Sequence, residues 1–303
     1  MENSINGYLR QLKEQLKNCD RATVQDALSD AEEYFRNELD NLKASKPGVP
    51  EESVFSSVVE EYGTPVEIAE AYKKVEARTS PSLAVRTRQQ NTSFLSRFFG
   101  VVIEPRAWGA LLYLLFTLAT GIIYFTWTVT GISLSLGLLV LIVGIPIAGI
   151  FILSTRGLAL LEGRMVEALI GIRMPHRPLF SKNDKGIWAK FKALIIDRYT
   201  WFSMVYMLLQ LPLGITYFTV FVTLIAASLG LVVNPILELV FNIPIFGYNG
   251  SLYYLNGWVM PFAVIAGVWL FFLTLHLAKV IGNLHGKLAK LMLVREYKGE
   301  TEK

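Results

Sequence analysis

Charged residues are missing from long parts of this 303-residue sequence, and these gaps define its class. Residues 107–155 form an unbroken run of 49 residues without Asp, Glu, Lys, Arg or His. A membrane-spanning helix needs roughly 20 mostly apolar residues, so the run has room for two spans, whereas a soluble core does not require such a length. We expect spans at 108–130 and 136–153, with a break in the helix at 131–135.

Residues that carry chemistry are also scarce. The single cysteine, Cys19, excludes an internal disulfide, and the three histidines form no metal-ligand pattern with it. The sequence has no P-loop, no Gly-x-Gly-x-x-Gly, no Gly-x-Ser-x-Gly and no His-Glu-x-x-His. No pair of carboxylates lies within the expected spans, which disfavours transport by a charge relay. We therefore expect no enzyme, no cofactor, no metal site and no direct binding of nucleic acid.

An internal duplication is present. At an offset of 93 residues, 17 of the 33 residues in 108–140 recur, and Trp108 recurs as Trp201. Apolar composition alone does not align Trp, Tyr, Gly and Thr in register, so the spans form two copies of one helix pair. Matching resumes more weakly at an offset of 119, so the second copy contains 26 extra residues, at about 232–257. The third span begins at Trp201, and the fourth is expected at 258–275.

The inserted residues contain several helix breakers, among them Asn234-Pro235, Pro244 and Asn249-Gly250. These residues argue against a plain fifth span. Residues 236–246 are nevertheless apolar enough for a re-entrant or interfacial piece. The sequence leaves open whether 232–257 is re-entrant, interfacial or a fifth span.

Charge divides the chain near residue 77. Residues 1–77 contain 9 basic and 16 acidic residues, whereas residues 78–303 contain 20 basic and 9 acidic residues. Apolar residues at helical spacing predict four short helices in the first part, the last opened by the capping box at 64–67. The expected domains are a helical unit at 1–77, a basic linker at 78–100, the duplicated membrane domain at 101–293 and a polar tail at 294–303.

Lys and Arg gather on one side of the expected topology. Nine lie in 156–198, six in 279–303 and five in 78–106, whereas 131–135 and 232–257 have none. Because basic residues accumulate on the cytoplasmic side, we expect a protein of the plasma membrane with both termini in the cytoplasm. Both copies then insert in the same sense, which gives parallel repeats.

Each copy ends in an amphipathic continuation, at 156–173 and at 276–290. We expect their charged faces to be solvated or to face lipid, and contact with the soluble unit is the alternative. The predicted fold is thus all-α: a small cytoplasmic helical domain and a four-helix transmembrane domain of two parallel hairpin repeats with amphipathic cytoplasmic helices.

Two tyrosines and a glutamine are the candidate ligand-binding residues inside the spans. Tyr124 and Tyr217 each follow a glycine, Gly121 or Gly214, by three residues, and a glycine permits close helix contact. The two phenols would line a symmetric pocket for a lipid or a small amphiphile, or belong to an aromatic belt and to packing. Gln210 is a polar residue in the third span that cannot titrate.

The insertion supplies two further candidates, Asn234 and Glu238. Glu238 is the only acidic residue on the predicted exterior, and a helix would place it on one face with Asn234 and Asn242. An interfacial loop is the alternative explanation.

The soluble unit contains three short stretches of one known pattern. They are Tyr8-Leu9-Arg10-Gln11-Leu12, Ala27-Leu28-Ser29-Asp30-Ala31-Glu32-Glu33-Tyr34-Phe35 and Gly63-Thr64-Pro65-Val66-Glu67-Ile68-Ala69. With them, the unit resembles the HAAS signalling domain of bacteria and archaea, which is associated with PadR-type transcription regulators. The resemblance implies a regulatory adaptor and no catalysis.

The membrane part has its own resemblance, covering about 100–293. Tyr113-Leu114-Leu115, Gly121-Ile122-Ile123-Tyr124-Phe125, Ser133-Leu134-Ser135-Leu136-Gly137, Arg156-Gly157-Leu158-Ala159-Leu160-Leu161-Glu162 and their repeat copies resemble the membrane "putative sensor" domain. In bacteria and archaea that domain often precedes histidine kinases. No kinase domain follows before Lys303, so we expect output through residues 1–77 or the cytoplasmic loops.

The predicted function is a polytopic membrane sensor or signalling regulator that has no catalytic domain and relays a cue to a cytoplasmic partner. That partner would be a PadR-type regulator or another signalling protein, and the chain would contact the lipid bilayer and form a homo-oligomer. The alternative is a small permease or lipid-handling protein with a regulatory appendage.

Overall fold

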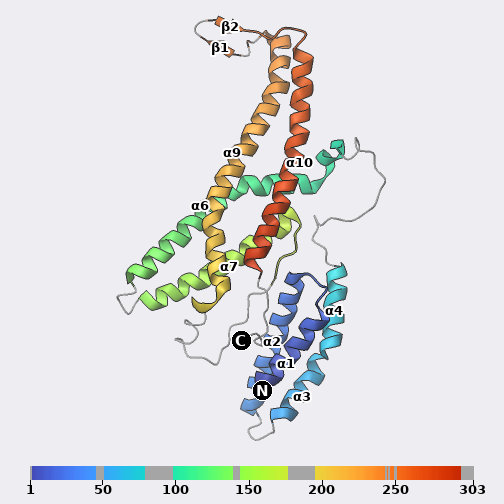
Figure 1. Ribbon diagram of the computed structural model, residues 1–303, viewed down its shortest axis with the longest axis vertical. Helices are drawn as coiled ribbons and strands as arrows, with labels where there is room; N and C mark the ends of the chain where they lie inside the picture. Colours follow the sequence, from blue (N-terminus) through green and yellow to red (C-terminus); the bar gives the residue numbers. More distant parts are fainter. Residues whose placement is uncertain are drawn as a thin grey trace. The chain divides into compact units, whose positions relative to one another are not determined.

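The structure is a computed structural model that describes residues 2–45, 51–78, 98–138, 144–176, 195–242, 244, 246–248 and 251–294. The predictions for most of the basic linker, for the loop that precedes the third span and for most of the polar tail lie outside these ranges. Within them the chain is almost entirely helical, as expected (Figure 1).

The N-terminal domain is a bundle of α1 (Glu2–Gln15), α2 (Arg21–Ser45), α3 (Glu51–Tyr62) and α4 (Pro65–Arg78). Its core is built from the apolar faces that the helical spacing predicted, with Leu12 and Phe35 completely buried. Tyr8 packs on Phe35 with ring centroids 4.5 Å apart, and its hydroxyl donates to the Gly63 carbonyl at 2.8 Å. The first helix is thereby fixed to the turn that precedes α4.

The predicted capping box starts α4. The Thr64 backbone N–H donates to the Glu67 carboxylate at 2.8 Å, and the Glu67 N–H donates to the Thr64 hydroxyl at 3.3 Å. These hydrogen bonds satisfy donors that a helix N-terminus leaves unpaired. The backbone and hydroxyl donors of Thr64 hold the pKa of Glu67 below its ordinary value. Gly63 precedes the box with a φ of 109°, which only glycine adopts readily.

Four further helices are long and apolar enough to cross a membrane: α6 (Pro105–Leu138), α7 (Gly144–Ile170), α9 (Arg198–Phe241) and α10 (Met260–Leu293). A short 3-10 turn, η1 (Gly100–Ile103), precedes α6. The prediction of a break at 131–135 is wrong, because α6 continues to Leu138. A Cβ at Gly131 would lie 2.1 Å from the Phe151 ring, so this glycine makes room for α7 and does not end a helix.

The insertion extends α9 and then turns back. The helix passes through Pro235 and ends at Phe241, where Asn242 adopts a φ of 58°. Two three-residue strands follow, β1 (Phe246–Tyr248) and β2 (Ser251–Tyr253), which pair antiparallel. In Figure 1 they lie at the end of the helix pair formed by α9 and α10. The sequence did not indicate this short hairpin, and the proline did not stop the helix.

Contacts group the chain into two compact units. The N-terminal domain falls in one unit with residues 128–206 and 287–303. Residues 85–127 and 207–286 form the other. The domain that carries the soluble helices is therefore in the same unit as α7 and the final turns of α10.

The two copies make equivalent local contacts. The Trp108 indole N–H donates to the Val102 carbonyl at 2.8 Å, and the Trp201 indole N–H donates to the Ile195 carbonyl at 2.8 Å. Both pairs are related by the 93-residue offset. The sequence duplication is thus reproduced in the structure at the start of the first helix of each copy.

The α6–α9 crossing is reciprocal. A Cβ at Gly121 would lie 2.7 Å from the Gln210 carbonyl oxygen, and one at Gly214 would lie 2.5 Å from the Thr117 carbonyl oxygen. Gly121 is equivalent to Gly214, and Thr117 is equivalent to Gln210. Such an exchange, in which each site meets its partner's equivalent, is the pattern of a twofold contact.

Candidate functional site

Ion pairs connect the first helix of each copy to the second helix of the other copy. Glu104, at the start of α6, pairs with Lys279 of α10 at 2.6 Å. Asp197, the equivalent of Glu104, precedes α9 and pairs with Arg156 of α7 at 2.6 Å. The Arg156 guanidinium also donates to the Thr200 hydroxyl at 3.1 Å. The two copies are therefore interlocked through their polar ends.

Equivalent tyrosines continue this exchange inside the helices. The Tyr113 ring lies 5.2 Å from the His285 ring of α10, between centroids, and the Tyr206 hydroxyl donates to Glu162 of α7 at 2.9 Å. His285 is 1% exposed and Glu162 is completely buried. The expectation that the charged faces at 156–173 and 276–290 are solvated is therefore wrong for these two residues. An ionisable group inside a membrane helix is expensive to bury and usually functional.

The three candidate ligand-binding residues inside the spans, Tyr124, Gln210 and Tyr217, lie within the packed helices. Tyr217 places its hydroxyl 3.4 Å from His285 Nδ1, so it belongs to the same buried polar group as Tyr113. Tyr124 is 2% exposed, and Gln210 is completely buried at the α6–α9 crossing. We keep these three residues as proposed ligand-contacting residues, with His285 added to them by the structure.

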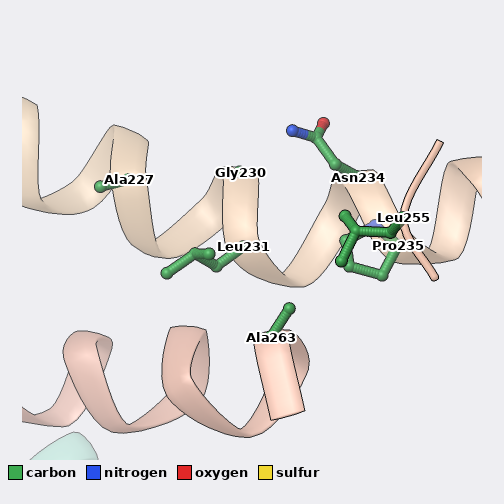
Figure 2. A pocket seen from close by; sticks show the side chains of 7 residues that line it. All are labelled: Ala227, Gly230, Leu231, Asn234, Pro235, Leu255 and Ala263. Carbon is green, nitrogen blue, oxygen red and sulfur yellow. The ribbon is translucent and has the colours of Figure 1, made fainter. Parts of the chain in front are cut away.

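The other two predicted residues lie near an open apolar depression of about 410 Å³ between α9 and the chain that leads into α10. Asn234 lines it, and Glu238 follows one turn later on the same face of α9. Glu238 is 4% exposed, and its carboxylate accepts the Leu255 backbone N–H at 3.1 Å. Figure 2 shows the Ala263 side chain pointing from α10 toward α9, and Leu255 lying beside Pro235. The depression is lined by Ala227, Gly230, Leu231, Asn234, Pro235, Leu255 and Ala263.

The N-terminal domain contacts the ends of two membrane helices through acidic residues. Asp20 forms an ion pair with Lys290 in the last turn of α10. The Asp26 carboxylate accepts the His176 backbone N–H at 2.8 Å, just after α7 ends. The His176 ring in turn lies 2.6 Å from Glu167 of α7. Of the two contacts, the one at Lys290 lies within 276–290, where a surface for the soluble unit was the alternative expectation, and its role in output stays a prediction.

Asp20 also organises the domain itself. Its second carboxylate oxygen accepts the Ala22 N–H at 2.9 Å and so caps α2, and its own N–H donates to Glu76 of α4 at 3.0 Å. Cys19 precedes it and is partly buried. Burial and the nearby Glu76 carboxylate raise the pKa of the Cys19 thiol, while the positive charges of Lys73 in α4 and of Arg173, which follows α7, oppose that rise. One turn thus joins α1, α2 and α4 close to the membrane helices.

Sequence reasoning did not find Glu162, His285, Asp20, Asp26 or Lys290 as site residues. Glu162 and His285 lie on amphipathic segments, where charge normally marks a solvated face. The repeat itself held a signal: the equivalent tyrosines Tyr113 and Tyr206 indicate two equivalent buried positions that each require a polar partner. Contacts between segments far apart in the chain, such as that of Asp20 with Lys290, produce no recognisable residue spacing in the sequence.

These features define an all-α, multi-pass membrane protein whose duplicated helix pairs are joined to a small helical domain. The family described as "Putative sensor" matches residues 113–293, more than half of the chain, and the chain belongs to that family. The HAAS family matches residues 7–71. Both resemblances inferred from the sequence are confirmed, and the two domains fit a signalling role. No curated protein and no solved structure matches the chain.

Proposed function

We propose that this protein is a membrane signalling regulator, which relays a cue from the bilayer or its outer face to a cytoplasmic partner. The cue changes the packing of the four membrane helices. The change reaches the N-terminal domain, residues 1–77, and alters what that domain binds. A PadR-type transcription regulator or another cytoplasmic signalling protein then reads the altered surface.

This proposal rests on two contacts that the start of α2 and its cap, Asp20, make with the segment after α7 and with the end of α10. Asp26 holds the backbone that follows α7, and Asp20 holds Lys290 at the end of α10. The two helices are the second members of the two copies. A relative shift of the copies therefore strains at least one of the two contacts, because Asp20 caps α2 and Asp26 lies near the start of the same helix.

The distribution of Lys and Arg supports a topology with both termini in the cytoplasm of a cell membrane, and with parallel repeats. The acidic N-terminal domain then lies on the same side as the basic loops. The domain boundaries that we propose remain near residues 77, 100 and 293. Assembly into a homo-oligomer would place several N-terminal domains next to each other for a multivalent partner.

The test compares transcript profiles in the native host with the full chain, with residues 1–77 deleted and with the whole gene deleted. We expect the two deletions to change the same set of transcripts, while the truncated chain still inserts into the membrane. A truncated chain that inserts and leaves every transcript at the level seen with the full chain would contradict the proposal.

Transport is a second candidate, because two ionisable side chains are buried in the long apolar helices. Glu162 and His285 are buried ionisable groups within helices long enough to span a membrane. Such groups occur on proton and ion pathways. Proton flux into liposomes that contain the purified chain separates the two functions: saturable flux that the Glu162→Gln variant loses would favour a permease.

A further inference from the structure

The insertion in the second copy builds the apolar depression. Three lining residues, Asn234, Pro235 and Leu255, belong to the insertion. The remaining lining residues belong to the helices of the second copy outside the insertion. The first copy lacks the insertion and still packs its two helices, with the Phe151 ring against Gly131. Helix packing alone therefore does not require the extra residues, which points to another role for them.

A tight helix contact closes one end of the depression. A Cβ at Gly267 of α10 would lie 2.9 Å from the Ser228 carbonyl oxygen, and the Ser228 hydroxyl donates to the Gly267 carbonyl at 2.9 Å. About one turn further along, small side chains leave the space between Leu231 and Ala263 open. Leu255, held in place by Glu238, borders the other end. The space is open and its lining is mostly apolar, which suits a hydrocarbon chain.

The charged group next to this space is the Glu238 carboxylate, and no Lys or Arg lies near Glu238 in the sequence. Residues 199–278 contain a single Asp, Glu, Lys or Arg, which is Glu238. Leu231, Asn234 and Glu238 follow each other at helical spacing along one face of α9. Proline has no N–H, so Pro235 leaves the Leu231 carbonyl without its usual helical donor. The buried Glu238 carboxylate lies one helical turn beyond Asn234 and bonds the backbone of Leu255, and both of those residues line the apolar space. A buried carboxylate is costly without a cation.

We propose that the depression binds a cationic amphiphile, with its apolar tail between α9 and α10 and its ammonium group at Glu238. The charge of the site excludes an anionic head group and favours a cation over a neutral one. The ligand class deepens the proposed function, since such a molecule would be the cue that changes the packing of the helices. Binding itself does not require the relay and is measured separately.

The experiment uses the full chain in nanodiscs of zwitterionic phosphatidylcholine, with empty nanodiscs to subtract partition into lipid. Isothermal titration below the critical micelle concentration compares dodecyltrimethylammonium with dodecyl sulfate and dodecyl maltoside, which share one tail. Glu238→Gln removes the charge but keeps an oxygen for the Leu255 N–H. Ala263→Leu fills the depression, and Ala266→Leu is its matched control on an exposed position of the same helix.

We expect saturable binding of dodecyltrimethylammonium that is at least about tenfold tighter than binding of the maltoside, with no saturable binding of the sulfate. Glu238→Gln should reduce the ammonium affinity to that of the maltoside. Ala263→Leu should abolish binding of the ammonium and of the maltoside, and Ala266→Leu should leave both affinities unchanged. Equal affinity for the three head groups, an unchanged preference in Glu238→Gln or no saturable binding would each overturn the proposal. Deletion of residues 1–77 should leave binding intact, so a failed relay and a failed site give different results.

Discussion

Lys290→Met removes the ion pair that joins the end of α10 to the N-terminal domain. Asp20 keeps its second role as the cap of α2, because a different carboxylate oxygen accepts the Ala22 N–H. The side chains of Lys290 and Asp20 are 20% and 28% exposed, so solvent screens the pair only in part. We expect a loss of about 0.5 to 1 kcal/mol in docking free energy, the upper range for such pairs.

That loss corresponds to about a two- to fivefold increase in the population of undocked domain. The native thiol of Cys19 reports it, because Cys19 is partly buried beside Asp20 and is the only cysteine. Its rate of alkylation at one alkaline pH should rise by the same factor in Lys290→Met. The control is Lys287→Met, an exposed lysine of the same helix for which the described residues show no ion pair. An unchanged rate in Lys290→Met, or an equal rise in Lys287→Met, would show that this ion pair does not hold the domain in place.

Three further predictions concern the fold. Gly121→Ala should destabilise the chain in detergent by about 1 to 3 kcal/mol through overpacking at the helix crossing, whereas Gly137→Ala, with nothing within 4 Å of its Cβ, should be neutral or stabilising in thermal melts. Tyr206→Phe should cost about 1 to 3 kcal/mol in the same assay, because the buried carboxylate that it contacts loses a donor. Thr64→Ala should speed hydrogen exchange in α4 by about fivefold for a cap worth about 1 kcal/mol. Because the folded pKa of Glu67 is lowered, its contribution is complete above the ordinary carboxyl pKa and disappears as pH falls through the lowered value, so the difference between Thr64→Ala and the native chain should shrink in acid.

The sequence predicted the parts of the fold that depend on local pattern. Helical spacing placed the core of the N-terminal domain, and the duplication placed Trp108 and Trp201 in equivalent contacts. The helix break at 131–135 was wrong because a glycine inside a membrane helix often marks close packing, as Gly131 does against Phe151. Pro235 failed to end α9 because an apolar helix tolerates a proline that its surroundings compensate.

The site was less predictable, because its contacts join distant segments. Asn234 and Glu238 could be proposed from the sequence, since a lone acidic residue in an apolar stretch is visible there, and their role in binding stays a prediction. Glu162 and His285 were hidden, because their neighbours in sequence are charged and the segment appears solvated. Only the three-dimensional exchange of helices between the copies brings each of them against a tyrosine.

In the proposed relay, the ends of α7 and α10 control the N-terminal domain through Asp26 and Lys290. The most direct measurement is the transcript profile of the native host when the chain carries Asp26→Ala and Lys290→Met together, with amounts in the membrane matched. We expect that this undocked chain, although it contains both domains, no longer gives the native profile and shifts the transcripts that respond to deletion of residues 1–77. A profile identical to that of the native chain, with Cys19 shown to be more accessible, would contradict it.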